Sequence, residues 1–236
     1  MKLLAIIPAR GCSKGIPEKN LVEINGRSLV ARALDTAKSS TAVTDIIVST
    51  DDNAIAAECE KNGMNVPFIR PANLSSDNAG MVDVILHSMD MFEKDNNVSS
   101  YVVVVLQPTS PFRKSSDIDR CFKMLEEQNA QSIVSVHEVK ESPYECFRNT
   151  QNGNQMLAES DGVLRRQDYL EQFYFINGVV YMADNEFIRK EKVLFKENES
   201  LLFNMDALRG VDIDDKDDLM LAEALASHPE FKGRLN

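Results

Sequence analysis

Two stretches of the chain combine residue types that bind phosphorylated ligands, and the first is IIPARGCSKGIPEKN, residues 6–20. It begins as an apolar run and breaks into a loop with two glycines, two prolines and the cations Arg10, Lys14 and Lys19. Glycines allow backbone N–H groups to approach a ligand, and Arg and Lys supply the positive charge that a polyphosphate needs. The segment matches neither the Walker A pattern nor GxGxxG. A Gly- and Pro-rich loop with solvated charges has the same composition, so both interpretations stay open.

The second stretch is GVDIDDKDDL, which is rich in carboxylates. Asp212 and Asp214 lie two residues apart on a strand predicted at 209–214, so both side chains would face the same side. Paired carboxylates at a strand end suit Mg²⁺, which binds through one or two carboxylates and the phosphates of a substrate. The other acids suit the first turn of a following helix, whose dipole stabilises negative charge there: Asp215, Asp217 and Asp218. All five acids could serve that turn, so the metal site is one of two interpretations.

Other polar residues give weaker signals. Gln107 follows an apolar run in LQPTSPFR, so its amide could recognise a base or a sugar, although a rigid turn alone explains the pattern. Ser13 and Ser110 do not lie in a GxSxG elbow, which argues against a serine nucleophile. Three histidines show no spacing typical of a triad or a metal site: His87, His137 and His228. Arg165 and Arg166 could bind an anion, although a solvated pair is the simpler interpretation.

Composition limits the possible partners and location of the protein. The chain has 236 residues, is 43% hydrophobic and carries a net charge of -11, so it can bury a core but repels nucleic acid and anionic membranes. No apolar run reaches the length of a membrane span, and the one in MKLLAIIPARG is too short for a secretion signal. The cysteines are widely spaced and form no CxxC pair: Cys12, Cys59, Cys121 and Cys146. We therefore predict a cytoplasmic protein with reduced thiols and with neither nucleic acid nor membrane as a partner.

The elements that must position these residues follow an alternating pattern. Apolar runs of strand length are separated by segments with helical periodicity, one of them with Ser115 or Ser116 as the expected N-cap. The predicted strands are 3–8, 45–50, 101–107, 132–136, 178–183 and 209–214. This alternation predicts βαβ units in an α/β fold with a mostly parallel sheet covered on both faces. Because ligands bind at the carboxyl ends of such strands, we expect four polar stretches to meet: 8–20, 49–52, 107–113 and 212–218.

The alternation fails after residue 140. Asn152-Gly153 lies between two plausible strands, which is a hairpin signal. The core pattern resumes near residue 178 and closes with a helix through Leu225. We therefore predict a single domain over 1–236 with an inserted lobe at about 140–175.

Six stretches in this order resemble one family: IIPARGCSKGIPEKN, IIVSTDD, FIRPANLSSDNA, LQPTSPFR, FINGVVY and VDIDDKDDL. The chain resembles the acylneuraminate cytidylyltransferases, which are the CMP-sialic acid synthetases and their relatives. The resemblance runs from residue 3 to about 225. The Lys19-Asn20 ending of the first motif differs from that of the similar enzymes that act on 3-deoxy-manno-octulosonate. The resemblance implies the three-layer, Rossmann-like fold of nucleotide-diphospho-sugar transferases, with the inserted lobe used for dimerisation.

The resemblance also implies a reaction and a set of site residues. CTP and a nine-carbon 2-keto sugar acid would give a CMP-sugar and pyrophosphate, with Mg²⁺ as cofactor. The implied nucleotide site comprises Arg10, Ser13, Lys14, Lys19, Asn20, Arg70, Asp77 and Ala79. The implied catalytic residues are Arg10, Lys14, Lys19 and Asp214, and the implied Mg²⁺ ligands are Asp212 and Asp214. The implied sugar site comprises Gln107, Asn177, Gly178 and Tyr181, with Arg166 reaching the sugar of the neighbour in a homodimer.

Three positions depart from the family pattern. Cys12 replaces a Gly or polar residue, Glu18 adds negative charge beside the phosphate ligands, and Glu145 lies where sialate-specific members can carry a sugar-binding Lys. Glu145 leaves the sugar open, with a pseudaminate-, legionaminate- or octulosonate-like acid as the alternatives. A non-catalytic nucleotide-binding protein is the less favoured alternative, because every charged position that the phosphate chemistry needs is filled.

Overall fold

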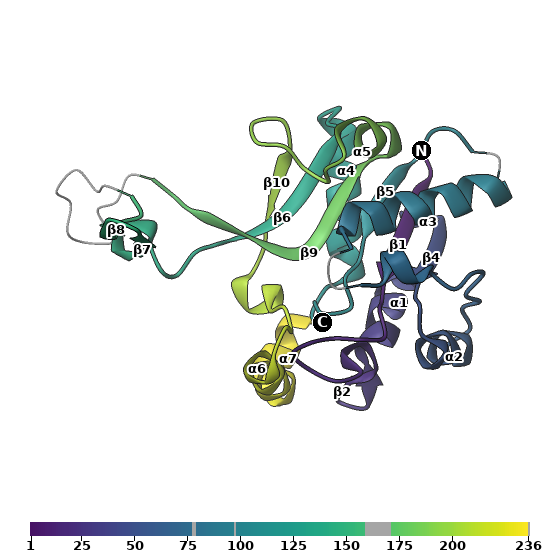
Figure 1. The fold of residues 1–236 in the computed structure, drawn as a ribbon, viewed down its shortest axis with the longest axis horizontal. Helices are drawn as coiled ribbons and strands as arrows, with labels where there is room; N and C mark the ends of the chain where they lie inside the picture. Colours follow the sequence, from purple (N-terminus) through teal and green to yellow (C-terminus); the bar gives the residue numbers. More distant parts are fainter. Residues whose placement is uncertain (77–78, 97, 159–170, 236) are drawn as a thin grey trace.

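The computed structural model describes residues 1–76, 79–96, 98–158 and 171–235, and its centre is a six-stranded sheet (Figure 1). The strand order is β10-β6-β9-β5-β1-β4. The strands are β1 (Leu3–Pro8), β4 (Asp45–Ser49), β5 (Val102–Val105), β6 (Ser132–Glu138), β9 (Tyr174–Asp184) and β10 (Leu201–Asn204). β1 pairs in parallel with β4 and β5, and β6 with β10, whereas β9 is antiparallel to β5 and β6. The predicted α/β fold with a mostly parallel sheet is confirmed.

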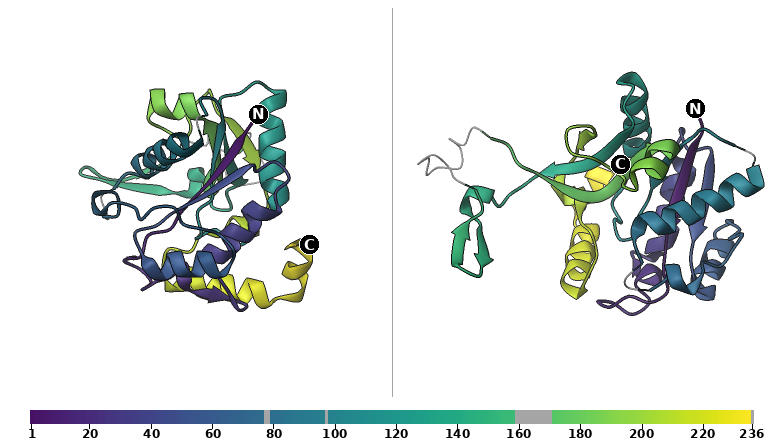
Figure 2. Two further views of the ribbon diagram at one scale, coloured as in Figure 1. Left: turned by 90° about the vertical axis from the view of Figure 1, so that its right-hand side faces the viewer. Right: turned by 45° about the horizontal axis from the view of Figure 1, so that its top comes forward.

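Helices cover both faces of this sheet, which explains why β1 and β5 are apolar at every position. Alternate β1 residues Leu3, Ala5 and Ile7 pack in one buried cluster with side chains of α1 (Leu29–Ser39), α2 (Asn53–Lys61) and α4 (Ser115–Glu127). Leu4 and Ile6 pack in a second cluster with α3 (Met81–Asn96) and α5 (Asn185–Glu191). Successive strand residues point to opposite faces, so these clusters form the two interfaces of a three-layer arrangement (Figure 2).

A third cluster positions the polar loops. It includes buried side chains from α6 (Lys216–Ser227), from α7 (Pro229–Leu235) and from the small hairpin formed by β2 (Glu23–Ile24) and β3 (Arg27–Ser28). Three of its buried side chains come from predicted site loops: Ile16 from 8–20, Phe112 from 107–113 and Ile213 from the 212–218 stretch. Each loop therefore has an apolar anchor in one shared core, which fixes the loops relative to one another.

The inserted segment begins on the extensions of β6 and β9. A 3-10 turn, η3 (Pro143–Glu145), leads into the hairpin of β7 (Phe147–Thr150) and β8 (Gly153–Met156), which lies apart from the main body (Figure 1). The chain reverses at Gln151 and Asn152, where the sequence predicted a turn, and Gly153 has a φ of 104°. Glycine adopts this positive φ without the steric cost that a side chain would add.

Three details differ from the sequence predictions. Residues 209–214 form no strand, because Ala207–Gly210 is a 3-10 turn and the following backbone bonds to a loop, with Ile213 N donating to Thr109 O at 2.9 Å. The edge strand β10 was not predicted. The N-cap of α4 is Lys114 rather than Ser115 or Ser116, because the Asp117 carboxylate accepts from Lys114 N at 2.9 Å and defines the helix start there.

Among the described residues, no helix combines the length and apolar character that crossing a bilayer requires.

Candidate active site

A cavity of about 280 Å³ lies where the predicted loops meet. Eight of the residues predicted for the site line it: Arg10, Ser13, Lys19, Asn20, Arg70, Ala79, Gln107 and Asp214. They come from the carboxyl ends of β1 and β5, from the segment after β4 and from the loop before α6. The fold therefore brings together residues as far apart in the chain as Arg10 and Asp214, as expected for loops at the carboxyl ends of parallel strands.

The loop after β1 is fixed by hydrogen bonds between its backbone and two side chains, and by close packing at its two glycines. Gly11 N donates to Asp51 Oδ1 at 3.0 Å, and Asn20 Nδ2 donates to Arg10 O at 2.8 Å. A Cβ at Gly11 would overlap the side chain of Asp52, and a Cβ at Gly15 would overlap the backbone oxygen of Asp214. Both glycines are therefore needed for the loop to pack against its neighbours, a requirement that the sequence analysis did not identify.

Three cations line the cavity, two from the loop after β1 and one from the segment after α2. Arg70 is only 4% exposed, and its Nη2 lies 3.4 Å from Asp51 Oδ1. Burial lowers the pKa of the Arg70 guanidinium, and the Asp51 carboxylate partly offsets that effect. Lys19 Nζ lies 2.9 Å from Asp214 Oδ1, while Arg10 lines the cavity directly after β1. Lys14, which the sequence placed with them, has an exposed side chain and does not line the cavity.

Asp51 connects two of the segments that line the cavity, and it was not predicted as a site residue. Its Oδ1 accepts from Gly11 N and from Arg70 Nη2, so one carboxylate joins the loop after β1 to the segment that carries Arg70. The sequence could have identified Asp51 from its position at the end of the IIVSTDD strand, because residues 49–52 were expected at the same edge of the sheet as the other polar stretches.

The two candidate metal ligands flank a buried residue. Ile213 is fully buried in the third cluster, so Asp212 and Asp214 on either side of it extend away from that core. The next acids cap α6, as the sequence predicted, because Asp215 Oδ1 accepts from Asp217 N and Asp218 N, at 2.9 and 3.0 Å. Asp218 Oδ2 in turn accepts from Asp214 N at 2.9 Å, which fixes the backbone beside the candidate ligand.

The chemistry of this carboxylate pair fits Mg²⁺. Asp212 Oδ1 is buried and has no hydrogen-bond partner among the described residues, which is unusual for a buried polar atom. Burial raises the pKa of Asp212, a hydrogen bond from Thr109 opposes this, and the nearby Asp214 charge adds to it. Within the described ranges no three His, Cys, Asp or Glu side chains gather as a complete metal site. Two carboxylates completed by substrate phosphates and water are the arrangement that Mg²⁺ commonly uses.

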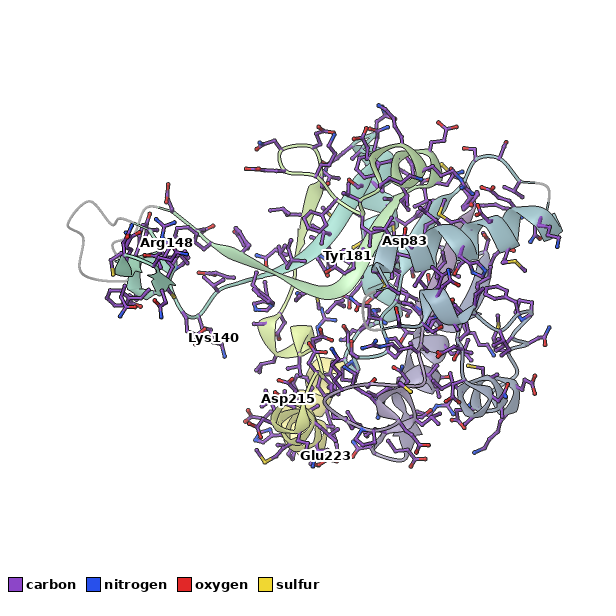
Figure 3. The ribbon with its side chains drawn as sticks, viewed as in Figure 1. Asp83, Lys140, Arg148, Tyr181, Asp215 and Glu223 are labelled. Atoms are coloured by element: carbon purple, nitrogen blue, oxygen red, sulfur yellow. The ribbon has the colours of Figure 1, made fainter. Side chains whose placement is uncertain are left out.

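The predicted sugar residues lie beside Asp212. A Cβ placed on Gly178 would lie 3.2 Å from Gln107 Nε2 and 4.0 Å from Asp212 Oδ2, so these three residues are neighbours. Tyr181 is half-buried on β9, and burial and the Asp212 charge both raise the pKa of its hydroxyl (Figure 3). Phe195 stacks on Tyr181 with ring centroids 6.2 Å apart and was not predicted, because its segment KVLFKENES has no regular pattern.

The remaining predicted residues are placed differently. Asn177 is 2% exposed, does not line the cavity and has its Oδ1 bonded to Ser135 Oγ and Val179 N. Asp77 and Arg166 lie outside the described residues. Cys12 and Glu18 are exposed, and Glu18 adopts a left-handed backbone conformation before the 3-10 turn η1 (Lys19–Leu21).

A protein-family model described as cytidylyltransferase matches residues 4–228 of the chain. The chain belongs to this family. Enzymes of this kind transfer the cytidylyl group of CTP to an acceptor.

Two relatives illustrate the family. The chain is 31% identical to the CMP-N,N'-diacetyllegionaminic acid synthase of Legionella pneumophila over 225 residues, which cover 95% of this cytidylyltransferase and 96% of the relative. It is 30% identical to the N-acylneuraminate cytidylyltransferase of Streptococcus agalactiae over 223 residues. That match covers 93% of this chain and 52% of the streptococcal protein, so the chain spans about half the length of that relative.

A solved structure shares the fold. CMP:2-keto-3-deoxy-manno-octonic acid synthetase complexed with CTP superposes with a TM-score of 0.69 at 16% identity, covering 95% of this chain and 98% of the other. The likeness confirms the nucleotide-diphospho-sugar transferase fold predicted from the sequence.

Proposed function

We propose that this cytidylyltransferase activates a nine-carbon 2-keto sugar acid of the N-acylneuraminate type with CTP, giving a CMP-sugar and pyrophosphate. The observation that carries the proposal is the cavity itself. Arg10, Lys19 and Arg70 line it together with Asp214, while Gln107 lines it from the end of β5. A cavity with cations and a carboxylate on one side and a neutral amide on another suits a triphosphate and a hydroxylated acceptor.

In the proposed reaction the C2 hydroxyl of the acceptor attacks the α-phosphorus of CTP in line. The new bond joins the sugar oxygen to phosphorus, the proton of the hydroxyl passes to water, and the bond to the leaving pyrophosphate breaks as negative charge moves onto it. Arg10 and Lys19, with Ser13 and Lys14 of the same loop, would hold the triphosphate and neutralise that charge. Asn20, Arg70 and Ala79 would line the nucleotide pocket, with Asp77 nearby.

Asp212 and Asp214 would hold Mg²⁺. When bound, the ion would orient the α-phosphate and acidify the attacking hydroxyl. In the structure Lys19 Nζ donates a hydrogen bond to Asp214 Oδ1. If the Lys19 side chain turned to a phosphate oxygen of CTP instead, Asp214 Oδ1 would become available to the metal.

The acceptor would lie on the side of Gln107, Gly178 and Tyr181, with Asn177 supporting that wall. We also propose a cytoplasmic homodimer in which Arg166 reaches the sugar of the neighbouring protomer. Exposed apolar side chains on and around the inserted hairpin support an interface there: Phe147, Met156, Leu157, Tyr174 and Phe175. Figure 3 shows Lys140 and Arg148 on the same segment, where they would surround that apolar area.

A second acceptor class has its own support. The Legionella relative, named as a legionaminic acid synthase, is matched over nearly its full length, and Glu145 is exposed on η3 where a sialate-binding Lys would be expected. A legionaminate-like acid is therefore the leading alternative, ahead of pseudaminate- or octulosonate-like acids.

The test is Mg²⁺-dependent release of pyrophosphate from CTP with N-acetylneuraminate, a legionaminate, a pseudaminate and 3-deoxy-manno-octulosonate offered separately. We expect release with a nine-carbon acid, and the acid with the highest kcat/KM identifies the acceptor. Folded protein that binds CTP but releases no pyrophosphate with any acid would overturn the proposal and favour a binding role.

A further inference from the structure

The proposed acceptor site lies beside an irregular part of β9, where Gly178 is a neighbour of Gln107, a residue that lines the cavity. β6 and β9 pair at Val134 with Tyr181 and again at Val136 with Ile176, so the single residue Ser135 faces the four residues 177–180. We call residues 177–180 the bulge. β5 ends at Val105, which pairs with Tyr181, so the bulge begins where β5 stops and Gln107 follows. Bulges of this kind redirect side chains at the edges of sheets.

Ser135 holds the bulge from the β6 side. It is fully buried, its Oγ donates to Asn177 Oδ1 at 2.6 Å, and the same Oγ accepts from Val180 N at 2.8 Å. Asn177 Oδ1 also accepts from Val179 N at 3.2 Å. One hydroxyl and one amide therefore satisfy the backbone groups that the irregular pairing leaves without strand partners.

Arg113 holds the bulge from the other side and joins it to the end of β5. Its Nε donates to Val179 O at 2.5 Å and its Nη2 donates to Gln107 O at 2.8 Å. Arg113 is 6% exposed, and burial lowers the pKa of its guanidinium to about 10, so it remains charged at neutral pH. The charges of Asp117 and Asp212 oppose this effect of burial. The two donors bridge a carbonyl oxygen of the bulge and one at the end of β5, a geometric role that suits the planar fork of Arg.

We propose that Ser135 and Arg113 are positioning residues for the acceptor side, which they set by holding Gly178 of the bulge against Gln107. This inference rests on the proposed function. Neither side chain contacts the acceptor, because both bond to residues behind the cavity wall. Gly178 has a φ of 73° and lies close to Gln107 Nε2, so a small shift of the bulge changes where that amide points. The cations of the proposed CTP side come from other segments, whereas the charge of Arg113 interacts with that of Asp212, so the test of CTP binding uses Ser135, whose bonds are to the bulge.

The first test compares two serines of β6. Ser135→Ala removes two hydrogen bonds from the bulge, whereas Ser132→Ala removes a 2.6 Å bond to Ser200 at the other end of the strand, and both serines are fully buried. We expect Ser135→Ala to lower kcat/KM for the acceptor about three- to tenfold, and the Kd of CTP, measured by calorimetry without acceptor, to stay within about twofold. Ser132→Ala should leave both values unchanged. Equal effects of the two variants, or a parallel loss of CTP affinity, would overturn the proposal.

The second test uses Arg113→Lys, which keeps the charge but cannot bridge both carbonyls in the same plane. The matched control is Arg189→Lys, since Arg189 also makes two side-chain bonds, to Asp90 and Glu93, but lies on α5. We expect faster amide hydrogen exchange at Val179 and Val180 in Arg113→Lys and Ser135→Ala, and unchanged exchange there in the control. This measurement requires no acceptor, so it still decides the inference if no acid sugar is turned over and the proposed function fails. Protection at these amides that is already absent in the wild-type protein, or unchanged in Arg113→Lys, would overturn it.

Discussion

The two sides of the cavity are built by different means. The nucleotide side consists of loops whose charged side chains face the ligand space, such as Arg10, Lys19 and Arg70. The acceptor side depends on neutral hydrogen bonds inside the protein, through which Ser135 and Arg113 hold the bulge of β9. In the proposed function, the nucleotide side would recognise charge, and the acceptor side would recognise shape and the direction of a few polar groups.

This difference has an energetic basis. Charge-assisted hydrogen bonds to a triphosphate are strong, so loops that are only partly ordered can still bind it. An acceptor with several hydroxyl groups offers weaker bonds, and discrimination between similar sugars requires donors and acceptors held in fixed positions. We therefore expect mutations on the nucleotide side to abolish turnover with any acceptor, and mutations on the acceptor side to change which acid is used.

The largest expected effect comes from removing charge. Arg10→Ala and Asp214→Ala should each reduce kcat/KM by a factor on the order of 10³, because Arg10 would neutralise the triphosphate directly and Asp214 would hold the Mg²⁺ that does so. The side chain of Asp214 is 77% exposed, so its loss should leave the melting temperature and the circular dichroism spectrum unchanged. Pyrophosphate release under saturating CTP and Mg²⁺ measures the effect.

Asp217→Asn is the control for charge alone. Asp217 lies three residues from Asp214 in the first turn of α6 and does not line the cavity. Its substitution should leave activity within about twofold, since surface charges of this kind contribute little. Near-normal activity in Arg10→Ala or Asp214→Ala would contradict the assigned roles.

Gly178→Ala should affect only the acceptor side. The methyl group would lie 3.2 Å from Gln107 Nε2, and the positive φ of Gly178 makes any side chain strained. We expect kcat/KM for the acceptor to fall about 10- to 100-fold, equivalent to about 1.4–2.8 kcal/mol, with little change in the Kd of CTP. Gly153→Ala is the matched control, because Gly153 also has a positive φ but lies in the distant hairpin with open space around it. Equal losses of CTP and acceptor binding in Gly178→Ala would show that the two sides are not separable.

Sequence patterns pointed to residues of the nucleotide side more directly than to those of the acceptor side, for a physical reason. Loops that bind phosphate need particular residue types in a short segment, so residues 6–20 and the Asp212–Asp214 pair stood out by composition and spacing, and the family resemblance then assigned their binding roles. The acceptor side depends on a change in pairing between β6 and β9, and nothing in SIVSVHE indicates that Ser135 faces four residues.

The same reason explains the misplaced elements. The segment 209–214 alternates apolar and acidic residues as a strand would, yet its backbone bonds to the loop at Thr109, and Arg209 forms a buried ion pair with Asp117 at 2.6 Å. Tertiary contacts of this kind determine the local structure of a short segment, and the hydrophobic periodicity of the segment does not reveal them. The central strands and amphipathic helices were predictable because their burial is continuous along the chain.

The smallest expected effect on activity comes from a mutation outside both sides of the cavity. This mutation tests whether the free energy of unfolding can change while kcat/KM stays the same. The Asp119 carboxylate of α4 accepts hydrogen bonds from Ser40 Oγ at 2.5 Å and from the backbone of the loop after α1. Burial alone would raise the pKa of Asp119, but the hydrogen bonds from Ser40, Ala42 and Thr41 outweigh it and hold the pKa below its usual value. A depressed pKa in the folded state means that the stabilisation is complete above the unfolded-state pKa of about 3.9 and is lost as pH falls through the folded-state value.

Asp119→Asn should therefore lower the free energy of unfolding by about 1–2 kcal/mol at neutral pH, and the difference from wild type should shrink as the pH falls below about 4. Urea unfolding at several pH values, followed by circular dichroism, measures this dependence, and kcat/KM at neutral pH should stay unchanged. Asp90→Asn is the control, because its carboxylate is 64% exposed and Arg189 keeps Glu93 as a second partner. A stability difference for Asp119→Asn that is constant across pH would show that the amide fails for steric reasons rather than through loss of charge. A change in acceptor kinetics would mean that α4 transmits strain from this loop to Arg113, which precedes the helix by two residues, and that the acceptor side extends further than the bulge.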